Sequence, residues 1–207
     1  MILPTELNQL ATNTPGFLSQ SEGEALAKYL SSLPGRESVV EIGSYCGKST
    51  LYLGHAANLT KRIVYAIDHH QGSVEHQPGE FFYDTELTDA EGKTDTLVHF
   101  RHTIRKAKLQ HCVFPLVGPA NVIGLHWQQP LGLLFIDGGH SMEDAVSDYR
   151  LWSRHVVLGG IMAVHDHYPS ASAGGQAPKA IIDAALASGL WHREAQVDSL
   201  ALLRRLI

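Results

Sequence analysis

The 207-residue chain contains very little cysteine. Cys46 and Cys112 are its two cysteines, too few for a disulfide framework and not clustered as in a zinc site, so both are expected to be reduced thiols. Charged residues make up 18% of the chain, and the formal net charge of -5 provides no basic surface for nucleic acid or an anionic membrane. The 13 histidines are scattered, which argues against a histidine-rich metal-binding tract.

The sequence also lacks long apolar runs. No apolar stretch reaches the roughly 18–20 residues that span a bilayer. The opening residues, MILPTELNQL, contain no basic region followed by an apolar run, so no signal peptide is expected. No linker or internal repeat divides the chain. These absences predict a single domain over residues 1–207, in a cytoplasmic protein that contacts neither membrane nor nucleic acid.

Short apolar runs alternate with segments of helical periodicity along the chain. Strands are expected at residues 38–42, 62–67, 113–117, 131–136 and 161–165. Helices are expected at residues 21–33, 47–58, 95–107, 141–152 and 179–188. Two strand-like runs, 191–197 and 200–206, close the chain as a hairpin. The pattern predicts a doubly wound, Rossmann-like α/β sheet, mostly parallel with an antiparallel C-terminal strand and helices on both faces.

Two of the expected helices carry start signals. Ser21 and Glu24 have the spacing of a capping box at the start of the helix over residues 21–33. Ser141 and Asp144 are placed in the same way before the helix that ends at residue 152. Both pairs predict helix N-termini.

One long segment, residues 69–93, has no periodicity. A loop of this length within a compact domain is usually functional. Its aromatic and imidazole side chains could form the wall or lid of a substrate site: His69, His70, His76, Phe81, Phe82 and Tyr83. The alternative is an insertion that packs against a partner subunit.

The turn after the first strand reads EIGSYCGKST, over residues 41–50, and ends like a phosphate-binding loop. Such a loop needs four residues between its first glycine and Gly-Lys, whereas Gly43 and Gly47 enclose three. The dinucleotide-binding fingerprint also fails, because it requires a glycine at position 45. What remains is an acid-x-Gly-x-x-x-Gly pattern that begins at Glu41.

A second acid, Asp68, ends the second strand, 21 residues beyond Gly47. Ligands of open α/β sheets bind at the carboxyl ends of the strands, where Glu41 and Asp68 are both expected. Taken singly, Glu41 fits a solvated acid at a strand end, and Asp68 fits a turn or helix cap.

Together these residues resemble the first two motifs of the class I S-adenosylmethionine-dependent methyltransferases, over residues 39–164. The resemblance implies that the glycines let the backbone approach the methionine part of the cofactor and that Glu41 orders its amino end. It also implies that Asp68 binds both ribose hydroxyls. The cofactor-binding positions are then Glu41, Gly43, Ser44, Tyr45, Gly47, Ser49, Asp68, His69, Gly118 and Asp137.

A second group of polar residues follows the fourth and fifth strands. Asp137 ends the fourth strand, and His140 comes three residues later, after two glycines. His165 and Asp166 end the fifth strand. Adjacent parallel strands bring these residues to one edge of the sheet, and their oxygen and nitrogen atoms are suitable ligands for a divalent cation.

This second group resembles that of the metal-assisted O-methyltransferases that act on catechols and on antibiotic or sugar hydroxyls. The resemblance implies that Asp137, His165 and Asp166 bind the metal, with Asp137 and His140 catalytic and His140 the general base. His165 stands where the catechol enzymes have a carboxylate, so the cation is expected to be Mg²⁺ or Mn²⁺, with iron or zinc as alternatives.

Alternatives to this assignment stay open. His140 fits a cap for the next helix, and His165 fits a hydrogen-bonded residue behind the ligands. A third alternative has no metal, with His165 or His167 as the base.

The expected function is methyl transfer from S-adenosylmethionine to an oxygen of a small-molecule acceptor, such as a sugar, natural-product or catechol-like hydroxyl. The family resemblance also allows a homodimer. The rivals are a non-catalytic S-adenosylmethionine-binding protein and a phosphate-loop nucleotide-binding protein.

Overall fold

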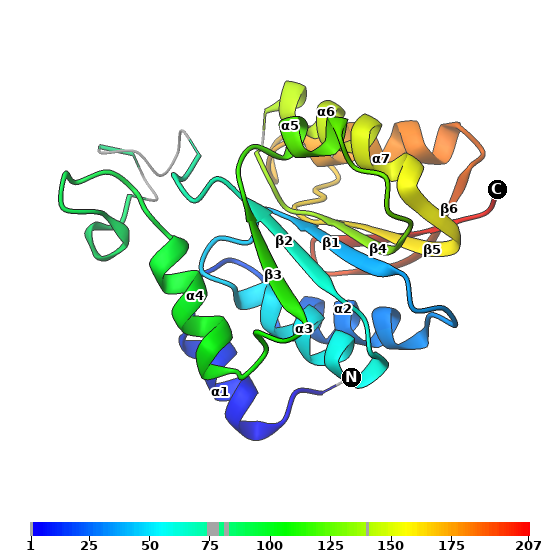
Figure 1. Cartoon of the computed structure of the whole chain (residues 1–207). Helices are drawn as coiled ribbons and strands as arrows, with labels where there is room; N and C mark the ends of the chain where they lie inside the picture. The colour runs from blue at the N-terminus through cyan, green and yellow to red at the C-terminus, as the bar shows by residue number, and fades with distance from the viewer. Residues whose placement is uncertain (1, 74–78, 81–82, 140) are drawn as a thin grey trace.

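The computed structural model describes residues 2–73, 79–80, 83–139 and 141–207 (Figure 1). The predicted base His140 and the loop residues His76, Phe81 and Phe82 lie outside this part. Within it, seven strands form one sheet in the order β3-β2-β1-β4-β5-β7-β6. The strands are β1 (Ser38–Ile42), β2 (Val64–Asp68), β3 (Val113–Val117), β4 (Leu131–Ile136), β5 (Val156–Val164), β6 (Trp191–Val197) and β7 (Leu200–Arg205).

The sheet is doubly wound, as predicted. The five strands β3, β2, β1, β4 and β5 pair in parallel in that order. Strand β7 runs antiparallel to both of its neighbours, β5 and β6. The helices are α1 (Thr5–Asn13), α2 (Gln20–Ser32), α3 (Lys48–Thr60), α4 (Leu97–Lys106), α5 (Ala120–Leu125), α6 (Met142–Trp152) and α7 (Ala177–Ala187). Two short 3₁₀ turns are η2 (Thr85–Leu87) and η3 (Ser153–His155).

Each face of the sheet has its own apolar core. Helices α1 to α4 cover one face and α5 to α7 the other (Figure 1). Successive side chains of β1 point into the two cores in turn. Val39 packs with the helices α1 to α4, and Val40 packs with the helices α5 to α7. Burial on both faces explains why the central strands read as continuous apolar runs. No helix in the described residues is long and apolar enough to span a membrane.

The predicted start of β5 was wrong. The strand begins at Val156 rather than at residue 161, and it includes the Gly159-Gly160 pair. Pairing with β4 shifts register between Leu131 and Leu133, and Gly159 has a φ of 74°. The two glycines therefore form an irregularity within the strand rather than a turn before it.

The predicted capping box of α2 was also wrong. The helix begins at Gln20, and its cap is Ser19, whose hydroxyl accepts from the Glu22 N–H while the Glu22 carboxylate accepts from the Ser19 N–H. The segment SQSEGE contains the Ser-x-x-Glu spacing twice, so spacing alone did not select the correct pair. The predicted cap of α6 is confirmed, since the Ser141 hydroxyl accepts from the Asp144 N–H at 3.0 Å.

Candidate active site

The loop between β1 and α3 follows an unusual backbone path. Residues Gly43, Tyr45 and Gly47 have φ angles of 84°, 46° and 93°, so every second residue is in the left-handed region. Glycine adopts this conformation freely, whereas at Tyr45 it costs about 1–3 kcal/mol. The Tyr45 ring lies 6.3 Å from that of Phe17. The loop thus takes up a glycine-like conformation at position 45 without a glycine there.

Lys48, the residue after this loop, forms a hydrogen bond within the protein. The Lys48 Nζ donates to the Gly16 carbonyl oxygen at 2.9 Å, which ties α3 to the segment before α2. The side chain that a phosphate loop would offer to a nucleotide is therefore used in an internal contact.

Asp68 supports the loop from the end of β2. Its Oδ2 accepts from the backbone N–H groups of Ser44 and Tyr45 at 3.0 and 2.8 Å, and its Oδ1 accepts from the His70 N–H at 2.7 Å. A carboxylate has about four acceptor positions, so one remains beside these three bonds, and a second ribose hydroxyl would have to share a position with a backbone N–H. The structure thus places Asp68 against the loop, where its predicted contact with the ribose can be made.

Glu41 is buried completely, so the alternative of a solvated acid is wrong. Its two carboxylate oxygens accept from the hydroxyls of Ser49 and Thr50 at 2.5 and 2.6 Å. Burial raises the pKa of Glu41 to about 8, with further contributions from the charges of Asp137 and Asp68, although the two hydroxyl bonds lower it. Its carboxyl group connects β1 to the start of α3, and its contact with the amino end of the cofactor stays a prediction.

Replacing Glu41 with glutamine is expected to flatten the dependence of folding stability on pH. The pKa is about 8 in the folded protein and near the ordinary 4.5 in the unfolded chain, so the folded state holds a proton that the unfolded state releases. Stability contributed by this group therefore falls as pH rises from about 4.5 to about 8. Urea unfolding at pH 5.5 and pH 8 measures the difference.

The matched control for that experiment is Glu24→Gln, which changes a partly exposed acid on α2 that accepts from the Gln20 amide. An unchanged pH slope in Glu41→Gln would show that Glu41 is ionised in the folded protein.

The other predicted cofactor residues fall into two groups. Ser44 is buried, and its hydroxyl has no hydrogen-bond partner among the described residues, which fits a group that waits for a polar ligand. Gly118 joins the site, since its N–H donates to the Asp68 carbonyl oxygen at 3.0 Å. By contrast, the Ser49 hydroxyl is bound to Glu41, and the exposed His69 accepts from the Gln71 N–H.

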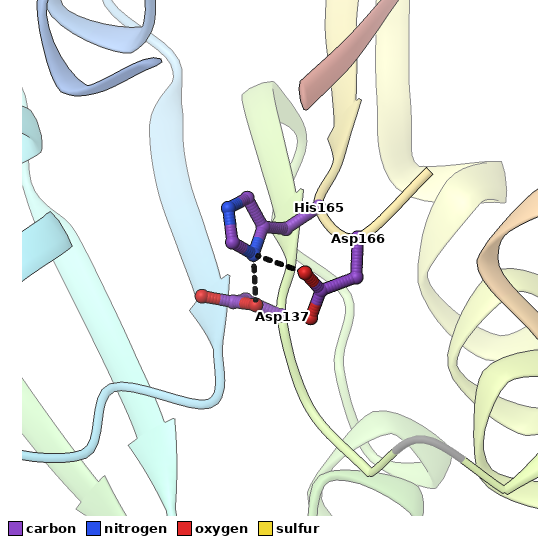
Figure 2. A group of neighbouring side chains, drawn as sticks. All are labelled: Asp137, His165 and Asp166. Carbon is purple, nitrogen blue, oxygen red and sulfur yellow. Dashed lines mark ion pairs between the residues drawn. The ribbon is translucent and has the colours of Figure 1, made fainter. Parts of the chain in front are cut away.

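The predicted metal ligands meet at the ends of β4 and β5 (Figure 2). The Nδ1 atom of His165 lies 3.0 Å from Asp137 Oδ1 and 3.5 Å from Asp166 Oδ1. The His165 side chain is 3% exposed, and the two acids are 22% and 24% exposed. Asp166 has a φ of 56°, a conformation that is uncommon for residues other than glycine but that aspartate adopts more readily than most.

The geometry around His165 Nδ1 fits a cation better than a hydrogen bond. Although Asp137 is within ion-pair distance, Nδ1 has no partner of hydrogen-bond geometry in the described residues. The three ligand atoms lie within 4.8 Å of one another. Neighbouring oxygen ligands of a cation bound at about 2.1 Å lie about 3 Å apart. The residues therefore fit a small divalent cation.

The charges of the cluster are strongly coupled. With no cation bound, burial lowers the pKa of His165, but the surrounding carboxylates of Asp137, Asp166 and Glu22 outweigh burial and raise the pKa to about 12. In that state the ring keeps its proton and is a poor base, which disfavours one of the metal-free alternatives, and a cation at Nδ1 would take the place of that proton. Burial and the charge of Arg193 lower the pKa of His167, so His167 still fits the metal-free alternative in which it acts as the base.

The cofactor loop and the metal ligands are joined by their backbones. The Asp137 N–H donates to the Ile42 carbonyl oxygen at 2.9 Å. A Cβ atom on Gly43 would lie 2.0 Å from the Asp137 carbonyl oxygen, closer than any allowed contact. Glycine is therefore required at position 43 by this close approach as well as by its φ angle.

Sequence reasoning missed Glu22 and assigned His70 only to the loop that could line the substrate site, whereas both residues are buried in the candidate site. His70 braces the loop after β2, through its N–H to Asp68 and its Nδ1 to the Thr96 hydroxyl at 2.8 Å. Glu22 lies 3.2 Å from His165 Nε2, although 143 residues separate the two in sequence. The sequence prediction placed the capping box at Ser21 and Glu24, and no local pattern indicates that Glu22 contacts the residue that follows β5.

Comparison with known proteins now places the chain. A family model described as a methyltransferase domain matches residues 40–167, more than half of the chain. The O-methyltransferase NovP aligns with a TM-score of 0.71 at 16% identity, over 91% of this chain and 81% of NovP. The O-methyltransferase from Bacillus cereus in complex with SAH has a TM-score of 0.68 at 14% identity, over 99% and 92%. The cofactor-bound Rv0187 from MTB has a TM-score of 0.69 at 19% identity, over 96% and 87%.

The fold and the family match define a class I S-adenosylmethionine-dependent methyltransferase. The chain belongs to the family of methyltransferase domains whose model covers residues 40–167. The solved structures, at these low identities, share its fold. This assignment decides against the phosphate-loop alternative.

Proposed function

We propose that the protein methylates an oxygen of a small-molecule acceptor, with a divalent cation held by Asp137, His165 and Asp166. The observation that carries the proposal is the convergence of these three side chains on one point, in backbone contact with the cofactor loop. The names of NovP and the Bacillus cereus protein, both O-methyltransferases, support oxygen as the methyl acceptor.

Separate groups of residues align the cofactor and the acceptor oxygen. The methyl group of the cofactor is already activated by its positive sulfur, so the reaction needs an aligned and deprotonated oxygen. Asp68 and the loop from Gly43 to Gly47 hold the cofactor in one orientation, and alignment of this kind lowers the barrier by removing orientational freedom. A cation bound to the three ligands lowers the pKa of the acceptor hydroxyl.

We assign acceptance of the hydroxyl proton to His140. This residue lies outside the described part of the chain, and its role rests on its position three residues after Asp137, beyond two glycines. The loop over residues 69–93 is our candidate for the acceptor wall. Burial raises the pKa of Tyr45 to about 12, with contributions from the charges of Cys46 and Asp84, and the contribution of Asp84 indicates that this part of the loop lies near Tyr45.

The proposal is tested by calorimetric titration with S-adenosylhomocysteine and, separately, with ATP plus magnesium. We expect micromolar binding of the first and none of the second. Methyl transfer is then measured on panels of catechols, sugars and hydroxylated natural products, with added Mg²⁺ or Mn²⁺ and after extensive chelation. Cation-dependent turnover supports the proposal.

Other outcomes separate the alternatives. Binding of S-adenosylhomocysteine with no turnover across the panels would favour a non-catalytic binder. The full rate after chelation would remove the cation from the mechanism and leave His140 or His167 as the base.

A further inference from the structure

We propose that Glu22 is a positioning residue that holds His165 with its Nδ1 atom directed at the cation. The inference rests on the proposed cation-assisted function, and it adds a residue from α2 to a site that is otherwise built from the ends of β4 and β5. The carboxylate of Glu22 accepts from His165 Nε2, on the side of the ring away from Asp137 and Asp166.

Glu22 is itself held rigidly. Its Oε1 accepts from the N–H and the hydroxyl of Ser199 at 2.9 and 2.7 Å, and its Oε2 accepts from the Ser19 N–H at 2.8 Å. The residue is 2% exposed. With donors from the start of α2 and from the turn between β6 and β7, the carboxylate has one orientation in which all of its partners are satisfied.

This orientation fixes the histidine ring. Because Nε2 is bound to Glu22, the remaining nitrogen, Nδ1, points to the two acids (Figure 2). Metal-binding histidines commonly donate their second N–H group to a carboxylate, which sets the ring orientation and strengthens the ligand. The ring also contacts Phe135 edge-on, at 6.4 Å between centroids. Glu22 and Phe135 together leave Nδ1 available for the cation.

Capping of α2 alone does not explain the contacts and the burial of the Glu22 side chain. The capping box uses the bond between the Ser19 N–H and Oε2, whereas the bonds from Ser199 and His165 lie outside it. A glutamate that only capped a helix would not need burial between two other segments. The two roles can be separated, because Ser19→Ala removes the hydroxyl that caps α2 and leaves the contact between Glu22 and His165 in place.

The experiment measures the affinity of the purified protein for Mn²⁺ alone, by calorimetry, in wild type, Glu22→Ala, Glu22→Gln and Ser19→Ala. Loss of a carboxylate behind a metal-binding histidine costs about 10–100-fold in metal affinity, which we expect for Glu22→Ala. Glutamine keeps the capping geometry and an acceptor oxygen, so it keeps the fold and should lose about 5–10-fold. Ser19→Ala should stay within about twofold of wild type, since its ligands are intact.

A second readout follows the histidine itself. Pulsed electron paramagnetic resonance of bound Mn²⁺ detects a coordinated imidazole nitrogen. The nitrogen signal is expected in wild type and Ser19→Ala, and it should weaken or disappear in Glu22→Ala. Binding of S-adenosylhomocysteine, which uses the loop after β1, verifies that each variant is folded.

Two results would overturn the inference while leaving the proposed function intact. One is wild-type Mn²⁺ affinity and nitrogen signal in both Glu22 variants. The other is an equal loss in Ser19→Ala, which would make the effect one of helix capping. If wild type bound S-adenosylhomocysteine but no Mn²⁺, the cation part of the proposed function would fail, and the role of Glu22 with it.

Discussion

Replacing Asp68 with alanine is expected to weaken binding of S-adenosylhomocysteine about 100-fold or more. Hydrogen bonds to a charged group contribute about 1.5–3 kcal/mol each, and two ribose hydroxyls would lose their acceptor. Each factor of ten in affinity corresponds to about 1.4 kcal/mol. Calorimetric titration of the variant measures the loss directly.

The variant also removes the brace from Ser44 and Tyr45, so a second comparison is needed to isolate the ribose contact. The 2′-deoxy analogue of S-adenosylhomocysteine lacks one of the two hydroxyls. Wild type should discriminate against this analogue, and Asp68→Ala should discriminate much less, because the partner of the missing hydroxyl is gone.

Asp89→Ala is the matched control, since Asp89 accepts from the N–H groups of Glu91 and Lys93 in another turn. Equal discrimination by wild type and Asp68→Ala would assign Asp68 to the loop alone.

Replacing Asp137 with asparagine is expected to lower the rate of methyl transfer about 1000-fold, because cation assistance is worth several kcal/mol and each 1.4 kcal/mol is a factor of ten. Asparagine keeps the shape of the side chain and the backbone bond to Ile42, so the fold and most of the cofactor affinity should remain. Single-turnover assays at saturating cofactor and Mn²⁺ measure the chemical step.

A nearby buried acid provides the control for Asp137. Burial raises the pKa of Asp148 to about 7, with a contribution from Asp144, so asparagine resembles the protonated form that is already well populated at neutral pH. Asp148 is outside the ligand set, and Asp148→Asn should keep the rate within about threefold. Retention of more than a tenth of the wild-type rate in Asp137→Asn would contradict the proposed cation site.

The sequence predicted the parts of this protein that depend on local patterns. The strand ends at Asp68 and Asp137 followed from apolar runs and the rule that ligands bind at the carboxyl ends of parallel strands. The glycines at positions 43 and 47 were identified from the acid-x-Gly-x-x-x-Gly pattern between a strand and a helix, and the structure shows that both have left-handed φ angles. These signals lie within a few residues of the feature that they predict.

The parts that were missed depend on contacts between distant segments or on ambiguous spacing. Glu22 and His165 meet because the turn before β7 lies against the start of α2, and neither sequence neighbourhood contains information about the other. Helix α1 was not predicted, because its segment has few strongly apolar positions, with Ala11 as its buried residue. The choice between Ser19 and Ser21 as the cap of α2 depended on packing, because both have glutamate three residues later.

The contact between Gly43 and the Asp137 carbonyl also has a consequence for engineering this protein. The spacing between the two halves of the site is set by two main chains in contact, with no adjustable side chain between them. Acceptors of different size therefore have to be accommodated elsewhere, and the candidates are the loop residues beyond His70 and the segment after Asp166, which is exposed at residues 169–173. Libraries that aim at new acceptors should vary those segments and keep residues 41–47 and 137 constant.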